Sequence, residues 1–224
     1  MDYVISLGGS LIAPDKLDIE FLKNFRALIL NHINLGKKFI VICGGGKIAR
    51  DYQKSASEIV ELTRDDLDWL GIHSTRLNAH LLRTIFRKEA HTVIIKNPNK
   101  KIETKKPLII AAGWKPGFST DYDAVVLARS YGIRTIINLS NIDYVYDSDP
   151  NKNSHAKPFK NLSWKDFRKL VGDKWDPGLN SPFDPIASKE AERLGLRVAI
   201  MSGRHLKNLD NFLIGKGFIG TTIK

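Results

Sequence analysis

The chain contains little cysteine and no long hydrophobic run. One cysteine in 224 residues excludes an internal disulfide, which agrees with a reducing compartment. No apolar stretch approaches the roughly 18 residues that a membrane-spanning helix needs. Residues 1–4 lead directly into a strand-like run, without the basic and apolar regions of a secretory signal. We therefore expect a cytoplasmic protein that does not bind a membrane.

Several common signatures are absent as well. The six histidines have no metal-ligand spacing, which weighs against a zinc site. The main glycine-rich run, residues 44–47, is neither a Walker A loop nor a G-x-G-x-x-G fingerprint. Internal repeats, low-complexity stretches and obvious linkers are missing too, so we expect residues 1–224 to form a single domain.

Acidic residues are the minority charge. The chain has 35 Lys and Arg against 24 Asp and Glu, for a formal net charge of +11. This balance attracts anions, either nucleic acid or nucleotides. One local cluster surrounds a predicted turn and comprises Lys96, Lys100, Lys101, Lys105 and Lys106. We interpret it first as a solvated loop, with an RNA-contacting patch or a lid over a charged ligand as the alternatives.

Strand-like and helix-like patterns alternate along the whole chain. The patterns predict strands at 3–7, 39–43, 92–96, 108–112, 134–139, 197–201 and 218–223. They predict helices at 19–33, 66–90 with a break near Gly71, 121–131, 163–171, 184–194 and 206–213. This alternation indicates an α/β fold, a three-layer αβα sandwich around a mainly parallel sheet. Ligands bind such sheets at the carboxyl ends of the strands.

Two glycine-rich segments follow predicted strands. They are Gly8-Gly9-Ser10 and Gly44-Gly45-Gly46-Lys47. A single run of this kind is as often a tight turn as a ligand site. A strand that ends in glycines can also bring backbone N–H groups against an anion, and a following helix adds its positive N-terminus. The N–H groups of Gly8, Gly9, Gly45 and Gly46 are therefore candidates to hold a phosphate from two sides.

Further motifs follow in a fixed order between Val4 and Thr222. They are residues 44–50 (GGGKIAR), 68–72 (DWLGI), 75–79 (TRLNA), 116–121 (PGFSTD), 140–146 (SNIDYVY), 149–150 (DP) and 183–185 (FDP). Together with Gly8-Gly9-Ser10, this ordered set resembles the amino acid kinase superfamily. Within it, the set most resembles the uridylate (UMP) kinases, especially their archaeal-type branch.

The resemblance implies an activity and its partners. The family transfers the γ-phosphate of ATP to UMP, which gives UDP and ADP in pyrimidine nucleotide biosynthesis. ATP is then the co-substrate, Mg²⁺ accompanies it, and no residue is assigned as a metal ligand. Residues 1–125 would form a lobe that mainly binds the acceptor, and residues 126–224 a lobe that mainly binds ATP. A homohexamer is the family's assembly.

The resemblance also implies roles for individual residues. Residues assigned to ATP are Gly9, Ser10, Gly46, Arg50, Ser140, Asn141, Tyr146 and Asp149. Residues assigned to UMP are Gly45, Asp68, Trp114, Lys115, Pro116, Gly117, Phe118, Ser119 and Thr120. The catalytic candidates are Lys47, Arg50, Asp121 and Asp184. Asp121 also fits a helix N-cap, Tyr146 also fits core packing, and at least one of Arg76 and Asn78 is expected to be structural.

The chain departs from the family pattern at four places. Ser6 stands where many relatives carry a lysine, although the archaeal-type branch also lacks it; Lys47 or Lys189 is the hypothetical substitute. Lys115 and Phe118 occupy the usual histidine positions of the acceptor loop. Tyr144 replaces a glycine in the nucleotide loop, which predicts a different local backbone.

Three other functions compete with a UMP kinase. Isopentenyl phosphate kinase shares the fold but prefers a histidine near the glycine loop, where this chain reads Lys-Ile-Ala-Arg. A non-catalytic oxyanion-binding storage protein is disfavoured by the intact phosphate loops with Asp121 and Asp184. Nucleic-acid binding rests on the net charge alone and is the least favoured partner.

Overall fold

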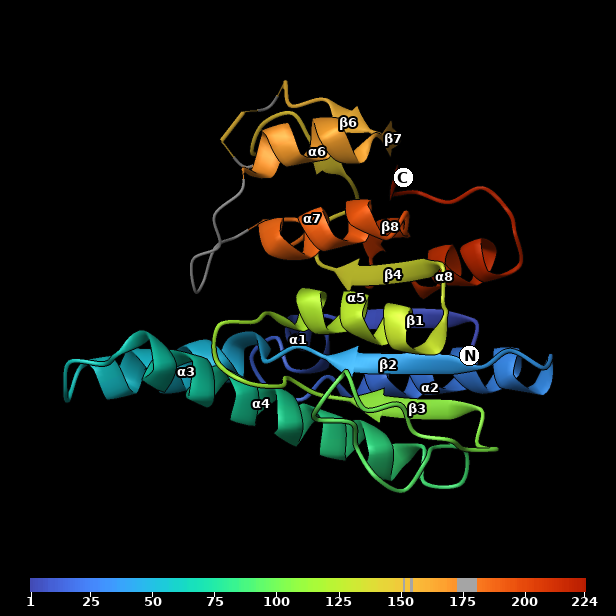
Figure 1. Cartoon of the computed structure of the whole chain (residues 1–224), viewed down its shortest axis with the longest axis horizontal. Helices are drawn as coiled ribbons and strands as arrows, with labels where there is room; N and C mark the ends of the chain where they lie inside the picture. Colours follow the sequence, from blue (N-terminus) through green and yellow to red (C-terminus); the bar gives the residue numbers. More distant parts are fainter. Residues whose placement is uncertain (151, 154, 173–180) are drawn as a thin grey trace.

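A seven-stranded sheet forms the centre of the computed structural model, which describes residues 1–150, 152–153, 155–172 and 181–224 (Figure 1). Its strands lie in the order β3-β2-β1-β4-β8-β9-β7. Every pair in it is parallel except β8 with β9. The strands are β1 Tyr3–Leu7, β2 Phe39–Cys43, β3 Leu108–Ala111, β4 Thr135–Ser140, β7 Asn161–Leu162, β8 Arg197–Ser202 and β9 Thr221–Ile223.

Helices cover both faces of the sheet, because alternate side chains of each strand point to opposite faces. Ile5 and Leu7 pack with α2, α4 and α8, whereas Val4 packs with α5, α6 and α7. The bounds are α2 Ile19–Asn34, α4 Arg64–Ile85, α5 Thr120–Tyr131, α6 Trp164–Val171, α7 Pro185–Arg193 and α8 Leu206–Leu213. The three-layer αβα sandwich is confirmed (Figure 1). Among the described residues, no helix is long and apolar enough to cross a membrane.

Two helices begin directly at the glycine-rich segments. These are the short α1 (Gly9–Ile12) and the longer α3 (Gly46–Ser57). Helix α3 packs against α4, and the two project together beyond the carboxyl ends of the strands (Figure 1). On the other side of the molecule, β5 (Val145–Tyr146) and β6 (Pro158–Phe159) form a small antiparallel pair that the sequence patterns did not predict.

Three of the predicted elements differ from the structure. Helix α4 runs without a break through Gly71 and ends at Ile85, not at residue 90. Residues 92–96 form no strand: only isolated bridges join Ala90 to Leu108 and Ile95 to Ala111, because the chain between them turns outward and exposes Val93. The last strand begins at Thr221 and not at residue 218. Before it, the backbone N–H of Ile219 donates to the side chain of Asn208 instead of to a neighbouring strand.

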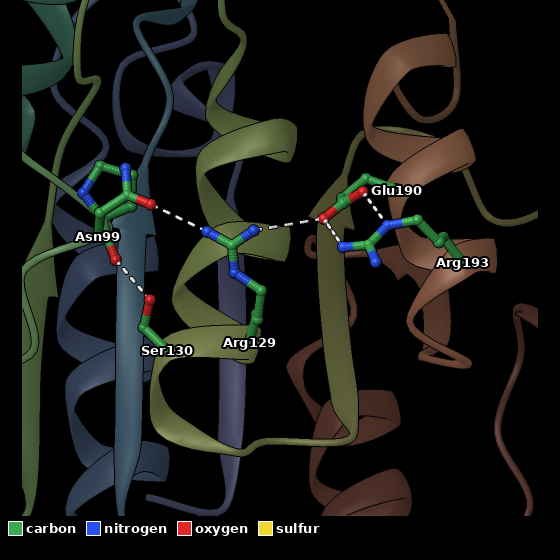
Figure 2. Close-up of polar contacts among 6 residues, drawn as sticks. Asn99, Arg129, Ser130, Glu190 and Arg193 are labelled. Carbon is green, nitrogen blue, oxygen red and sulfur yellow. Dashed lines mark hydrogen bonds and ion pairs between the residues drawn. The ribbon is translucent and has the colours of Figure 1, made fainter.

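The lysine-rich segment is anchored to the last turn of α5. Arg129 donates to Asn99 Oδ1 at 2.9 Å, and Ser130 Oγ donates to the Pro98 carbonyl at 2.9 Å. Figure 2 shows Arg129 reaching Glu190 of α7 on its other side, where Glu190 also pairs with Arg193. The first turn of α5 lies at the carboxyl ends of the strands, so these contacts hold the segment at the far end of the helix. They argue against a lid over a ligand at the strand ends.

Candidate active site

Three groups of predicted site residues lie at the carboxyl ends of the neighbouring strands β1, β2 and β4. Strand β1 is the point where the strand order reverses, with β2 and β3 on one side and β4 and β8 on the other. Ligands bind open α/β sheets at such a switch point. Gly8–Ser10 follow β1, residues 44–47 follow β2, and Ser140-Asn141 lie at the end of β4.

The two glycine-rich segments touch each other through their backbones. A Cβ atom on Gly9 would collide with the Gly46 nitrogen, and one on Gly46 would collide with the Gly9 carbonyl carbon. Gly46 also has φ +67°, a conformation that favours glycine. The side chain of Asn78, from α4, donates to the Gly44 carbonyl at 2.8 Å and supports this contact. Asn78 is therefore a structural residue of the glycine loop.

The free backbone donors are fewer than predicted. The N–H of Gly8 donates to the Leu139 carbonyl at 2.9 Å, so the prediction that it holds a phosphate is wrong. This bond completes the link between β1 and β4. Gly46 begins α3, and the first N–H groups of a helix have no partner within it. The second glycine loop thus offers the better backbone anion site.

Two basic side chains of α3 lie beside these loops. Arg50 extends towards the first loop, with Nη2 3.4 Å from Ser10 Oγ. Lys47 Nζ lies 2.8 Å from Asp51 Oδ2 and 3.4 Å from Asp15 Oδ1. Hydrogen bonds to Asp51 and Asp15 raise the pKa of Lys47, so its ammonium is charged and already paired.

Asp121 occupies the centre of the strand ends. Its Oδ1 accepts from Ser6 Oγ at 3.1 Å and from Asn138 Nδ2 at 3.0 Å. Its Oδ2 accepts from the backbone N–H of Asp184 at 3.3 Å. The N-cap of α5 is Ser119, so the interpretation of Asp121 as a cap is wrong. Asp121 instead joins β1, β4 and α7 at one carboxylate.

Burial makes Asp121 and Asp184 weak acids. Desolvation, with the neighbouring Asp184, raises the pKa of Asp121 to about 7. Desolvation also raises the pKa of Asp184, although its N-cap bond from Ala187 N opposes the shift. Ser6, at the position where many relatives have lysine, gives Asp121 a neutral partner and adds no positive charge. Near neutral pH the pair can therefore carry less than two negative charges.

Residues 113–119 include the loop that the resemblance assigns to the acceptor. This segment, called the acceptor loop below, is clamped between α4 and α5. Asp68 Oδ2 accepts from Gly117 N at 2.7 Å, where Gly117 has φ +85°. Arg76 Nη2 donates to the Trp114 carbonyl at 2.9 Å, and Trp114 N donates to Asp123 Oδ2 at 3.0 Å. Asp123 was not predicted. The sequence gives one signal for it: Asp123 lies on the face of the predicted helix 121–131 whose other residues are mainly apolar.

Three aromatic rings of this loop and α5 stack in a row. The centroids of Trp114 and Phe118 are 5.4 Å apart, and those of Phe118 and Tyr122 are 4.7 Å apart. Lys115 Nζ lies 4.3 Å from the Trp114 ring centroid. Lys115 and Phe118, two departures from the family pattern, thus belong to one aromatic–cation cluster. Pro116 lies within this loop, and Ser119 and Thr120 start α5 at its end.

The other residues assigned to ATP lie at the end of β4 or after it, on the other side of β1; they are Ser140, Asn141, Tyr146 and Asp149. Ser140 ends β4, and its carbonyl accepts from Gly203 N at 2.8 Å. Asn141 is exposed and Tyr146 is partly exposed on β5, which does not fit core packing of this ring. Tyr144 packs edge-on against Tyr146, with centroids 6.3 Å apart. Asp149 follows in an exposed turn, where its carbonyl accepts from Lys152 N at 3.0 Å.

Lys189 is placed away from the phosphate loops. It lines a surface hollow on the outer face of α7 with Tyr122, Ile186 and Arg193. Of the two lysines considered as substitutes for the missing one, Lys47 alone lies beside the glycine loops.

Comparisons with known proteins agree with this geometry. A model of the amino acid kinase family matches residues 1–202. The chain belongs to the amino acid kinase family. The uridylate kinase of Thermoplasma volcanium is 33% identical over 99% of this chain and 96% of its own length. That of Methanospirillum hungatei is 34% identical over 98% of this chain and 93% of its own.

Solved structures of the amino acid kinase family have the same fold. Uridylate kinase from Archaeoglobus fulgidus superposes with a TM-score of 0.85, at 29% identity and with both chains fully covered. UMP kinase from Bacillus anthracis gives a TM-score of 0.81 over 100% of this chain and 95% of its own, and its 22% identity supports the fold alone. The family and the fold predicted from the sequence are confirmed.

Proposed function

We propose that this protein is a uridylate kinase, which transfers the γ-phosphate of ATP to UMP and releases UDP and ADP. The observation that carries the proposal is the contact between the two glycine loops at the switch point, with Asp121 and Arg50 beside it. The names of the relatives of 33% and 34% identity support the same activity. We further propose that the protein is a cytoplasmic enzyme and that this reaction belongs to pyrimidine biosynthesis.

Phosphoryl transfer depends on alignment and on neutralising charge more than on covalent chemistry. In this proposal Gly9, Ser10 and Gly46 hold ATP, and Gly45 holds the UMP phosphate. Arg50 clamps the phosphates, since its guanidinium suits bidentate contact. Lys47 can add charge where the usual lysine is replaced by Ser6, provided that it leaves one of its two carboxylate partners.

Mg²⁺ is proposed to enter with ATP. Mg²⁺ commonly keeps several waters and binds through substrate phosphates. The Asp121 carboxylate already accepts three hydrogen bonds and its pKa is raised to about 7, which fits an organiser of hydrogen bonds better than a metal ligand. Bound with ATP, the ion would supply charge neutralisation at the phosphates.

In this proposal each half of the chain mainly binds one substrate. UMP would lie with Asp68 and the loop of Trp114–Thr120, within the lobe of residues 1–125. ATP would lie with Ser140, Asn141, Tyr146 and Asp149, within the lobe of residues 126–224. The transferred phosphate then passes beside β1, where the two lobes meet.

One assay tests the proposal. The protein is incubated with ATP, Mg²⁺ and one acceptor from a panel of UMP, CMP, dTMP and isopentenyl phosphate, and ADP release is measured. We expect a strong preference for UMP, because a site built to hydrogen-bond uracil leaves groups unpaired with cytosine. Comparable turnover of CMP, turnover of isopentenyl phosphate alone, or none with any acceptor would each overturn it.

We further propose that the protein assembles as a homohexamer. Support comes from an apolar groove between α3 and α4, which is lined by Tyr52, Trp69 and Leu77 among others. These three side chains are exposed by 63%, 41% and 61%, an unusual grouping for a free surface. Light scattering coupled to gel filtration measures the assembly, and a monomer at micromolar concentration would contradict it.

A further inference from the structure

The main chain of Trp114 is held from both sides. Its N–H donates to Asp123 Oδ2 at 3.0 Å, from α5. Its carbonyl accepts from Arg76 Nη2 at 2.9 Å, from α4. Gly113, one residue earlier, donates to Thr75 Oγ1 at 2.8 Å. The entry into the acceptor loop therefore depends on three side chains from two helices, and Asp123 is the anchor on the α5 side.

Asp123 lies in surroundings that are unusual for an acid. It is 0% exposed, and among the described residues its Oδ1 has no hydrogen-bond partner. Ala124 and Val125, which follow Asp123 on α5, belong to an apolar core cluster. The strands beneath α5 contribute to this cluster Val4, Ile40, Ile42, Ile109 and Ala111. A carboxylate there would be desolvated with one backbone hydrogen bond as its compensation.

The charged groups around it are engaged elsewhere. Asp121, on α5, accepts from Ser6, from Asn138 and from the backbone N–H of Asp184, the N-cap of α7. On α4, Arg76 contacts the Trp114 carbonyl and Asp68 contacts Gly117 N. In the loop, Lys115 lies over the Trp114 ring. No ion pair with Asp123 occurs in the part of the chain that the structure describes.

We propose that Asp123 is a positioning residue for the acceptor: in its neutral form it holds the Trp114 main chain and the aromatic row against α5, and its ionisation loosens the acceptor loop. The inference rests on the proposed function, because the loop of residues 113–119 is the acceptor loop only in that function. Asp123 touches no substrate in this proposal. It acts through Trp114, and through the Trp114–Phe118–Tyr122 row that follows from that anchor.

The proton affinity of the group agrees with this geometry. Burial raises the pKa of Asp123 to about 8, and the Trp114 hydrogen bond offsets only part of the shift. Below that pH the carboxyl group is neutral and Oδ2 still accepts from Trp114. Above it, a buried charge without a partner favours any movement of the loop that lets water reach it. A loosened, solvated carboxyl ionises near its ordinary pKa of about 4, so the anchor weakens as the pH rises from about 4 to 8 and changes little above pH 8.

Steady-state kinetics separate this role from a purely structural one. We expect the KM for UMP of the wild type to rise about tenfold between pH 6 and pH 8 and to level off above pH 8, because the loosened loop binds this proton less tightly than the anchored loop. Asp123→Asn keeps an oxygen for the Trp114 N–H but does not ionise, so its KM should stay flat over this range. Thr75→Val is the matched control: it removes the neighbouring anchor at Gly113, so it should raise KM at every pH and keep the slope.

A second readout needs neither substrate nor activity. The ¹⁵N-labelled backbone amide of Trp114 is followed by NMR from pH 6 to pH 10. A midpoint near pH 8 in the wild type that disappears in Asp123→Asn supports the proposal, even if the preferred acceptor is not UMP. An amide without a midpoint between pH 7 and pH 9, or a KM rise that persists in Asp123→Asn, overturns it. If the variant does not fold, the wild-type amide titration alone decides.

Discussion

The glycine loops and the acceptor loop sit on neighbouring strand ends but are built in different ways. The glycine loops are shaped by backbone packed on backbone, with Gly9 against Gly46. The acceptor loop is shaped by side chains that reach it from α4 and α5, namely Asp68, Arg76 and Asp123. The first construction tolerates no added atom, whereas the second can be loosened one hydrogen bond at a time. In the proposed function, this difference would make phosphate alignment rigid and leave the fit of the acceptor open to adjustment.

The largest effect is expected at the backbone contact. Gly46→Ala introduces a Cβ that collides with Gly9 and strains a residue at φ +67°. We expect kcat to fall by at least about 10²-fold, as for loss of an aligned phosphate-binding donor. Gly132→Ala is the matched control, because Gly132 has φ +68° and no described atom lies within 4 Å of such a Cβ. It should cost about 1–2 kcal/mol of unfolding free energy and leave kcat intact.

If both alanine variants lose activity to the same extent, strain rather than collision explains the effect. The glycine loops would then not be more rigid than the acceptor loop.

The next largest effect concerns the acid between the two regions. Asp121→Asn should lower kcat by about 10²-fold, because it disturbs the hydrogen bonds from Ser6, Asn138 and the Asp184 N–H. Stability should move the other way. The folded-state pKa of Asp121 is raised to about 7, so the folded protein binds this proton more tightly than the unfolded chain. Between about pH 4 and 7, stability from this group is therefore lost as pH rises.

Asn removes that loss, so chemical denaturation should find the Asp121→Asn variant more stable at pH 7.5 than the wild type by about 1–3 kcal/mol. At pH 4 the two proteins should be similar. A variant that is less stable at both pH values would show that Asp121 is an ionised structural anchor.

A smaller effect is expected at the basic side of the glycine loop. Lys47→Ala should lower kcat by about tenfold, if its charge reaches the transferring phosphate after leaving Asp15 or Asp51. Asp15→Asn frees the ammonium from one partner and should not lower kcat. Turnover numbers at saturating ATP and UMP measure both variants. Full kcat in Lys47→Ala would restrict Lys47 to a surface ion pair, which contributes little.

The smallest effect is expected in the side-chain-held loop. Asp68→Asn should raise the KM for UMP by several-fold, because it weakens the charged acceptor for Gly117 N at 2.7 Å. If Asp68 acts only by holding the loop, the variant should lose affinity equally for UMP and for 2′-deoxy-UMP. A loss confined to UMP would instead show that Asp68 contacts the ribose directly.

Much of the phosphate region was predictable from sequence. A strand followed by glycines and a helix is a local pattern, and the contact of Gly9 with Gly46 and the position of Arg50 beside Ser10 fit it; their roles toward a phosphate remain predictions. Helix ends were harder. Ser119, and not Asp121, caps α5. The sequence did not separate the two, because they are two residues apart and both residue types are common caps. The free donors were also overestimated, because the bond of Gly8 to Leu139 joins strands that are distant in sequence.

The amino-acid sequence by itself determined the α/β class, the alternation of strands and helices, and the glycine loops. These features follow from the periodicity of apolar residues and from local backbone conformations, which depend on residues close together in the chain. Tertiary structure alone decided what each polar side chain does. Ser6, Asn138 and Asp184 meet at Asp121, and Asp123 meets Trp114, because parallel strands with crossover helices bring their carboxyl ends to one edge. A hydrogen bond across 115 residues leaves no local trace in the sequence.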